Sequence, residues 1–217
     1  MQRILEPEVM DGEGEATAYA DMDHTAVNRA FVERLRALGA AGRMLDIGTG
    51  PADIPLLVVD RWSEARVVAV DLAPAMLALA AQRRDASPHA ARLELVLGDA
   101  TSLPLDDGSF DAVFSNTILH HLPDPVPFLR EAGRVLRPGG ALLIRDLYRP
   151  ASEAHVQDLV ALHAATTSPA GRELFTASLR AALTPDELRA AADAAGLADA
   201  VLVIDTDRHM SLQRAAA

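Results

Sequence analysis

The chain has 217 residues, no cysteine and a formal net charge of −11 at pH 7. The length is enough for one generous domain with its own core, and the lack of cysteine excludes disulfides, thiolate nucleophiles and cysteine metal sites. The net charge disfavours nucleic-acid partners, and without a signal-peptide pattern or a bilayer-length apolar stretch we expect a cytoplasmic protein with no membrane partner.

Residues 1–40 are expected to form an N-terminal helical cap. The stretch "EATAYADMDHTAVNRAFVERLRALG" is interpreted as a loop followed by an amphipathic helix that ends at Gly39. The apolar face of that helix consists of Val27, Phe31, Leu35 and Leu38. We expect this face to lie against a sheet.

Apolar runs of strand length then alternate with amphipathic stretches of helix length. Five runs are rich in Val, Leu and Ile, and their near-continuous apolarity is typical of buried parallel strands. They cover residues 44–47, 66–71, 92–99, 110–116 and 141–147. The alternation predicts an α/β fold with a doubly wound, mostly parallel sheet and helices on both faces.

The remaining elements have recognisable ends. Residues 124–140 are predicted to be a helix that stops at a Pro-Gly pair, and residues 184–196 a helix that starts with a capping box and ends at a glycine. Residues 199–205 and 208–213 are interpreted as a hairpin. The sheet would therefore have seven strands and finish with an antiparallel C-terminal strand.

The stretch "LDIGTGPAD" places two glycines, Gly48 and Gly50, between a strand and a helix. One interpretation is an ordinary turn, because Gly and Pro punctuate most chains. The other is a turn that lets a ligand approach the backbone, as in nucleotide-binding loops. The choice depends on a second feature.

That feature is a set of acids at the ends of successive strands. Asp46, Asp71 and Asp99 each lie at or near the end of an apolar run, so a parallel sheet would bring them to one edge. Ligands of open α/β sheets bind at this carboxyl edge, and Asp71 is placed to face a ribose diol. A single strand-ending Asp is often a cap, but three favour a ligand site.

With these motifs, the sequence resembles the class I S-adenosylmethionine-dependent methyltransferases, in particular the small-molecule branch that includes ubiquinone and menaquinone methyltransferases. The resemblance is carried by "LDIGTGPAD", "VVAVDLAPAML", "LGDATSLPLDDGSFDAVFSNTILHHLPDP" and "LRPGGALLIRD". It implies a Rossmann-like fold and methyl transfer from S-adenosyl-L-methionine to a small-molecule acceptor, with S-adenosyl-L-homocysteine as product.

The resemblance also implies a set of cofactor contacts. These are Tyr19, Asp46, Ile47, Gly48, Gly50, Asp71, Leu72, Met76, Asp99, Ala100 and Asn116. The two glycines would line the methionine part with Asp46 near its amino group, and Asp71 would hold the ribose. Leu72, Met76, Asp99 and the Ala100 amide would surround the adenine, Asn116 would lie beneath the sulfonium, and Tyr19 would close over the cofactor. One departure is Ala52, where the family often has a third glycine.

Two alternatives to this function stay open. A nicotinamide-dependent oxidoreductase would need a small residue at position 53, where this chain has Asp53, a carboxylate that would repel a pyrophosphate. A cofactor with a sulfonium and an ammonium but no phosphate tolerates an acidic loop. The second alternative is a protein that binds S-adenosylmethionine but transfers no methyl group.

Two adjacent histidines, His120 and His121, follow the strand that ends at Asn116. If the acceptor must lose a proton, a histidine is the natural base near neutral pH, so these are the candidate catalytic residues. The other interpretation is packing or cofactor contact. We expect no metal, because adjacent side chains would point in different directions and no third ligand is spaced to join them.

Residues 150–182 are too long for an ordinary connection between a strand and a helix. Their apolar stripes predict two short helices broken at residues 168–171. We expect an acceptor-side lid on a single domain covering 1–217, with surface decoration as the alternative. The candidate acceptor-side residues are Tyr148, Arg149, His155, His163 and Arg172.

Overall fold

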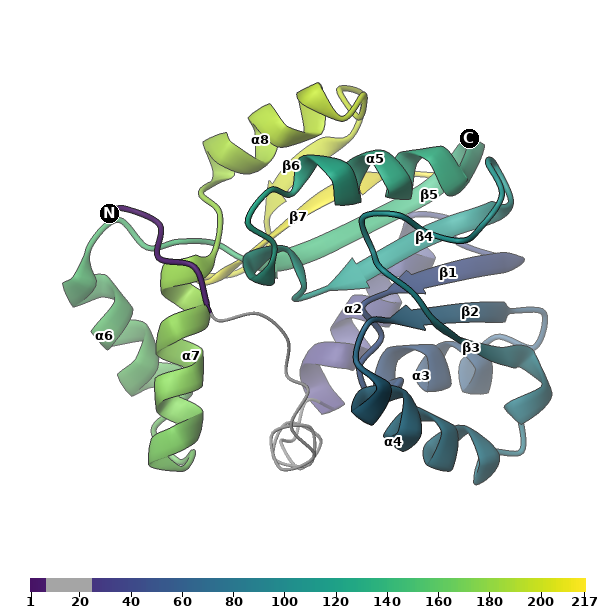
Figure 1. Cartoon of the computed structure of the whole chain (residues 1–217), viewed down its shortest axis with the longest axis horizontal. Coiled ribbons are helices and arrows are strands. Elements are labelled where there is room, and N and C mark those ends of the chain that lie inside the picture. The colour runs from purple at the N-terminus through teal and green to yellow at the C-terminus, as the bar shows by residue number, and fades with distance from the viewer. Residues whose placement is uncertain (7–24) are drawn as a thin grey trace.

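The computed structural model of the chain describes residues 1–6 and 25–217, so the predicted contact Tyr19 lies outside the described residues. The centre of the molecule is a seven-stranded sheet of order β3-β2-β1-β4-β5-β7-β6 (Figure 1). Strand β7 is antiparallel to both of its neighbours, and the pairs from β3 to β5 are parallel. The strands are β1 (Arg43–Ile47), β2 (Arg66–Asp71), β3 (Leu93–Leu97), β4 (Phe110–Asn116), β5 (Leu136–Leu147), β6 (Val201–Ile204) and β7 (His209–Arg214). The predicted fold class is confirmed.

Helices cover both faces of this sheet. Figure 1 shows α5 and α8 over one face and α2, α3 and α4 over the other. The helices are α2 (Thr25–Ala37), α3 (Asp53–Arg61), α4 (Pro74–Asp85), α5 (Val126–Val135), α6 (Glu153–His163), α7 (Pro169–Ala181) and α8 (Pro185–Ala194), with short 3-10 turns at Ala90–Arg92 and Leu119–His121. In the described part of the chain, no helix has the length and apolarity needed to cross a bilayer.

The sheet separates two hydrophobic cores because successive side chains of a strand point to opposite faces. Leu45 of β1 packs in the core under α5 and α8, whereas its neighbour Met44 packs in the core under α2 and α3. Both side chains are fully buried. Burial on both faces explains why the parallel strands are almost continuously apolar.

The carboxyl ends of the parallel strands point toward α6 and α7, on the left of Figure 1. The sequence predicts two helices in residues 150–182 with a break at 168–171, whereas in the structure the break covers residues 164–168 and residues 169–171 already belong to α7. Helix α7 begins after Ser168, whose hydroxyl accepts a hydrogen bond from the Gly171 amide at 3.1 Å. A small core that includes Leu147, Val156 and Leu179 joins the two helices to the end of β5.

Two other boundaries also differ from the sequence-based expectation. The helix predicted over 124–140 ends at Val135, and Leu136 already pairs with Phe110 as the first residue of β5. The hairpin turn also has four residues, 205–208, instead of two. In the first case, pairing within the sheet takes residues that the local pattern assigned to the helix. In the second, the Thr206 hydroxyl accepts hydrogen bonds from the amides of Arg208 and His209, which holds these residues in a wider turn.

Candidate functional site

A cavity of about 1020 Å³ opens at the carboxyl ends of β1, β2, β3, β4 and β5. Most of the predicted cofactor contacts line it, together with both histidines. These lining residues are Asp46, Gly48, Gly50, Asp71, Leu72, Met76, Asp99, Ala100, Asn116, His120 and His121. Ile47 does not line the cavity, because strand alternation directs its side chain into the core under α5.

The glycine-rich turn brings the backbone to the wall of this cavity. Gly48 and Gly50 have φ values of 76° and 54°, in the left-handed region that favours glycine. A Cβ at position 48 would lie 2.5 Å from Ile118, whereas a Cβ at position 50 would meet no atom within 4 Å. Gly48 therefore packs against the cavity wall, and Gly50 leaves open space where a ligand can approach.

Ala52 occupies the position where the family often has a third glycine, and its backbone explains that preference. Its φ is 64°, so this residue too is left-handed, and its side chain is buried. A non-glycine residue in this conformation costs about 1 kcal/mol. The methyl group fits, so the departure leaves the turn intact.

Asp46 is a buried carboxylate at the end of β1 that has no ion pair within the described residues. Its pKa is raised to about 7, mainly by burial and also by the charge of Asp71, while the nearby Thr49 hydroxyl opposes the rise. An acid held in this state gains most from a cationic partner. The ammonium group of an amino-acid ligand has the charge and the hydrogen-bond donors that this site lacks.

Asp71 organises the turn as well as facing the cavity. Its Oδ2 accepts a hydrogen bond from the Gly50 amide at 2.7 Å, and its Oδ1 accepts one from the Ala73 amide at 2.9 Å. Burial raises the pKa of this carboxyl, and the two amide bonds oppose that rise. Each carboxylate oxygen can accept more than one bond, so Asp71 can also hold a diol.

His120, in the short turn Leu119–His121, and Asp146, near the end of β5, form a buried pair. The Nδ1 atom of His120 lies 2.7 Å from Oδ1 of Asp146, and both side chains are buried. Burial lowers the pKa of His120, but the charge of Asp146 and the hydrogen bond to it outweigh burial and raise the pKa above its usual value. With Nδ1–H directed to the carboxylate, Nε2 carries the lone pair that can accept a proton.

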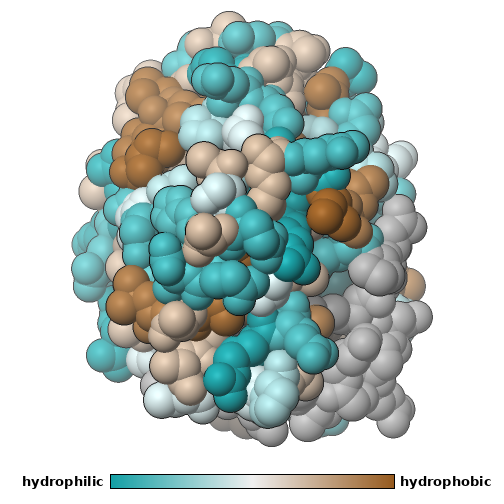
Figure 2. Space-filling model, turned by 90° about the vertical axis from the view of Figure 1, so that its left-hand side faces the viewer, coloured by the Kyte–Doolittle hydropathy of each residue, from teal (hydrophilic) through white to brown (hydrophobic). Residues whose placement is uncertain are grey.

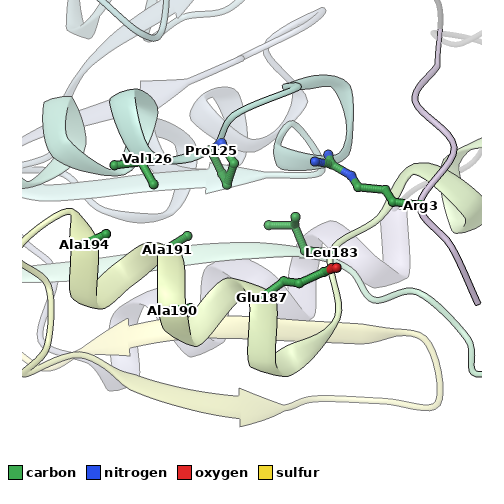
Figure 3. Close-up of a pocket in the computed structure, with 8 residues that line it drawn as sticks. All are labelled: Arg3, Pro125, Val126, Leu183, Glu187, Ala190, Ala191 and Ala194. Carbon is green, nitrogen blue, oxygen red and sulfur yellow. The ribbon is translucent and has the colours of Figure 1, made fainter.

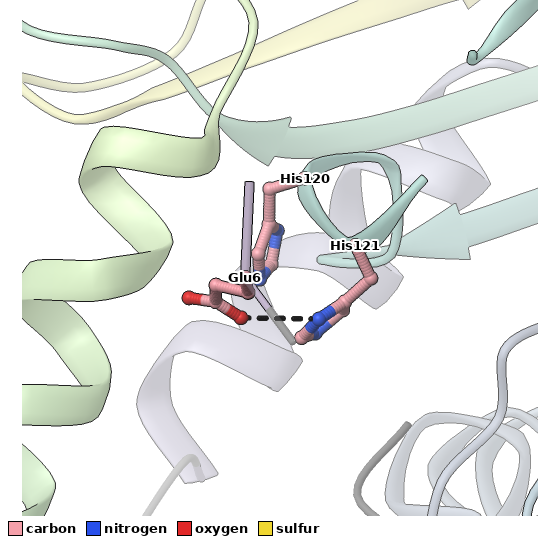
Figure 4. A group of neighbouring side chains, drawn as sticks. All are labelled: Glu6, His120 and His121. Atoms are coloured by element: carbon pink, nitrogen blue, oxygen red, sulfur yellow. Dashed lines mark ion pairs between the residues drawn. The ribbon is translucent and has the colours of Figure 1, made fainter. Parts of the chain in front are cut away.

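His121 contacts the N-terminal segment. Its Nδ1 lies 3.1 Å from Oε2 of Glu6, and the rings of His120 and His121 are 4.1 Å apart (Figure 4). One ligand atom from each of the three residues lies within 4.8 Å of the others, so together they could hold a divalent cation. The expectation that the two histidines point in different directions and have no third ligand is therefore wrong, because the tight turn at Leu119–His121 brings their rings together and Glu6 joins them from the N-terminal segment.

The two helices of residues 150–182 line the far side of the cavity. His163 of α6 and Leu174, Phe175 and Ser178 of α7 are among the lining residues. The outer surface on this side is mostly hydrophilic, with separate hydrophobic patches (Figure 2).

Of the other candidate acceptor-side residues, none lines the cavity. His155 and Arg172 are not among the lining residues. Arg149 is buried and pairs with Glu187 at 2.6 Å, and the Tyr148 hydroxyl donates to the Asp207 carbonyl. These last two side chains support the structure around the insertion, so the role predicted for them at the acceptor is not supported by their positions.

Sequence reasoning missed three residues of the site. Asp146 ends the apolar run of β5 as Asp46 and Asp71 end theirs, so the same pattern contained it. Arg145 lines the cavity beside it, and Glu6 reaches His121 from the N-terminus. No local pattern indicates the contact of Glu6.

A second hollow of about 440 Å³ lies between α5 and α8 (Figure 3). Its walls are mainly apolar, and its charged residues are Arg3 and Glu187. Arg3 donates to backbone carbonyls of residues 122 and 181, and Glu187 pairs with Arg149. These partners give both charges a structural role.

Comparison with known proteins agrees with this geometry. The family described as "Methyltransferase domain" matches residues 45–144. The chain is 32% identical over 123 residues to the ubiquinone/menaquinone biosynthesis C-methyltransferase UbiE of Geobacter sp. (strain M21), covering 56% of this chain and 52% of that protein. It is 39% identical over 111 residues to the demethylmenaquinone methyltransferase of Thermus thermophilus, covering 51% and 50%. The chain therefore spans about half the length of the curated relatives it matches.

The fold is shared with phosphoethanolamine N-methyltransferase 2 of Haemonchus contortus, solved in complex with S-adenosyl-L-methionine. The TM-score is 0.70 at 23% identity, over 90% of this chain and 44% of that one. The fold is therefore one shared with a Rossmann-like methyltransferase, and the matched stretch is similar to the methyltransferase domain, to UbiE and to the demethylmenaquinone methyltransferases. These similarities confirm the predicted resemblance to the class I S-adenosylmethionine-dependent methyltransferases.

Proposed function

We propose that this chain transfers the methyl group of S-adenosyl-L-methionine to a small-molecule acceptor that lies between His120 and the helices α6 and α7. The observation that carries the proposal is one continuous cavity with two kinds of wall. Strand-end acids and the glycine-rich turn line one part, and the histidines with α6 and α7 line the other. A cofactor and an acceptor bound in these two parts would meet beside Asn116.

The residues of the first part suit this cofactor. Asp46 offers a buried carboxylate to an ammonium, Gly50 leaves space at the backbone, and Asp71 offers acceptor oxygens to a ribose. The acids of this part other than Asp53 would repel a pyrophosphate, which disfavours the nicotinamide alternative, whereas Asp53 itself pairs with Arg83 at 2.5 Å. When bound, S-adenosyl-L-methionine supplies a methyl group that is already activated on a sulfonium.

The chain itself then has three tasks: to align the acceptor, to exclude water and to remove a proton where the acceptor carries one. Helices α6 and α7 would cover the acceptor, as expected for a lid. His120 would accept the proton at Nε2, and Asp146 would hold its ring and stabilise the charge that forms. His121, bound to Glu6, would position the N-terminal segment beside the same site.

The test is a screen of small metabolites for release of S-adenosyl-L-homocysteine. The wild-type chain should turn over at least one acceptor, and His120→Ala should lose about a hundredfold in turnover while keeping cofactor affinity within a few-fold. Turnover equal to that of wild type in both His120→Ala and His121→Ala would exclude either histidine as the base. It would point to an acceptor that needs no base. Binding of the cofactor without any turnover would favour the alternative of a binding protein.

A further inference from the structure

Most of the charged side chains that line the cavity are segregated by sign, and Asp124, which follows β4, lies outside both groups. The part of the wall that follows β1, β2 and β3 contributes four carboxylates, those of Asp46, Asp53, Asp71 and Asp99. The part formed by β5, α6 and the approach to β7 contributes the guanidinium groups of Arg145 and Arg208, together with His163 and the neutral His209. In the described chain neither part contains a lining residue of the opposite kind. The first part faces the cationic cofactor. The second part is basic, so it favours an anionic ligand.

Arg145 is the residue that makes this argument specific. Its side chain leaves the end of β5, lies 4.9 Å from the centroid of the Phe31 ring, and donates from Nε to Oδ1 of Asn116 at 2.9 Å. The residue is 8% exposed, and its buried Nη2 has no hydrogen-bond partner among the described residues. A buried guanidinium nitrogen without a partner is costly unless a ligand completes it.

Other arginines show how unusual this is. Arg149 is the second buried arginine of the described chain, and it pairs with Glu187 at 2.6 Å. Arg189 and Arg214 each also have one buried nitrogen without a partner, but each forms an ion pair, with Asp193 and Asp199 respectively. Arg145 forms no ion pair with the described residues. Burial lowers its pKa to about 10, which leaves it charged at neutral pH.

The surroundings of Arg145 carry charges of both signs, because Asp205 and Asp146 raise its pKa and Arg208 lowers it. Arg208 itself pairs with Asp207 at 3.2 Å, and neither Asp205 nor Asp146 forms an ion pair with Arg145 among the described residues. Arg208 lowers the pKa of both Arg145 and His209, which means that its charge acts on both. Burial and the two arginines lower the pKa of His209 to about 3, so this histidine is neutral and can donate a hydrogen bond. Asp205 and Asp146 raise the pKa of Arg145 without a hydrogen bond to it. Asp146 is hydrogen-bonded to His120 instead.

We propose that the methyl acceptor carries an anionic group, a carboxylate or a phosphate, which binds to the guanidinium of Arg145 with Arg208 as a second cationic contact. This inference rests on the proposed function, because it assigns the charge of the acceptor at the same site. A carboxylate or a phosphate matches the planar donor pair of a guanidinium. Through Asn116, the same side chain would hold the anionic group at a fixed place relative to the methyl group.

The experiment uses the full chain saturated with S-adenosyl-L-homocysteine and isothermal titration calorimetry with three small probes. Benzoate and phenyl phosphate carry the two anionic groups, and benzamide is the neutral isostere of benzoate. At least one anionic probe should bind, and benzamide should bind at least about tenfold more weakly. A preference for benzoate or for phenyl phosphate distinguishes the two sources of negative charge.

Variants assign the effect to the residue. Arg145→Gln should abolish the difference between benzoate and benzamide, whereas Arg189→Gln, which removes an arginine paired outside the cavity, should keep it. If Arg145→Gln does not fold, Arg208→Gln should reduce the difference. The proposal is overturned if no anionic probe binds at about 10 mM, if benzamide binds equally well, or if the difference survives in Arg145→Gln.

The failure of this inference is distinct from failure of the proposed function. If S-adenosyl-L-homocysteine does not bind the wild-type chain, the cofactor assignment is wrong. If it binds and the anionic probes do not, only the charge of the acceptor is wrong.

Discussion

Substituting Asp46 by Asn should change the stability of the free protein and its affinity for the cofactor in opposite directions. The carboxyl of Asp46 is buried without a cationic partner in the described chain, and its pKa is raised from 3.8 to about 7. The fold therefore disfavours the ionised form. Asn keeps the shape of the side chain and removes the charge, so it removes this penalty.

The sign and size follow from linkage. A raised pKa means that the native state binds the proton more tightly than the unfolded state, so the penalty is absent below about pH 4, grows between about pH 4 and pH 7, and is complete above pH 7. The rise corresponds to at most about 4 kcal/mol, since one pH unit is worth about 1.4 kcal/mol. Above pH 7 the free protein with Asp46→Asn should thus be more stable than wild type by up to this amount.

Affinity should move the other way, because the ionised Asp46 is the proposed partner of the cofactor ammonium. Loss of a hydrogen bond to a charged group costs about 1.5 to 3 kcal/mol, or about ten- to a hundredfold in affinity. Urea unfolding at about pH 5 and pH 8 measures the stability, and calorimetric titration with S-adenosyl-L-homocysteine measures the affinity. Asp193→Asn, on the exposed face of α8, is the control and should change neither property strongly. Reduced stability of Asp46→Asn at pH 8, or unchanged affinity, would refute the reasoning.

Four further predictions follow from the site. Turnover should be lost as the pH falls through the raised pKa of His120. Because the carboxylate of Asp146 raises that pKa, Asp146→Asn should move the loss to lower pH and slow the reaction. A pH profile that does not move would show that Asp146 does not act on His120. Asp71→Asn should weaken S-adenosyl-L-homocysteine binding by about tenfold, whereas unchanged affinity would make Asp71 a turn residue only. Dialysis against a chelator should leave turnover unchanged, since we expect no metal, and a loss restored by one added divalent ion would assign a metal to the histidine cluster. Replacing residues 152–180 by a short Gly/Ser linker should preserve cofactor binding and abolish methylation of the acceptor, and equal turnover by the truncated chain would exclude a lid.

The sheet and the cofactor part of the site could be predicted because their determinants are local. The apolar runs of the parallel strands are buried on both faces, and an acid that ends such a run must lie at the carboxyl edge of the sheet. Asp46 and Asp71 follow from this pattern, and both line the cavity. Asp146 ends β5 in the same way and was missed because the pattern was not followed to the last parallel strand.

The acceptor part was harder to predict because tertiary contacts create it. Glu6 and His121 are far apart in sequence, and no spacing rule connects them. Arg149 was expected at the acceptor but pairs with Glu187, whereas Arg145, within β5, packs against the Phe31 ring and lines the cavity. Which of two nearby arginines has a partner depends on elements that pack against them, and a single sequence does not record that.

The most direct measurement of the central claim is the melting temperature of the wild-type chain with S-adenosyl-L-homocysteine and, separately, with NADH. A ligand that binds only the native state raises the melting temperature by mass action. The account predicts a concentration-dependent rise with S-adenosyl-L-homocysteine and no change with NADH. A rise with NADH and none with S-adenosyl-L-homocysteine would contradict it.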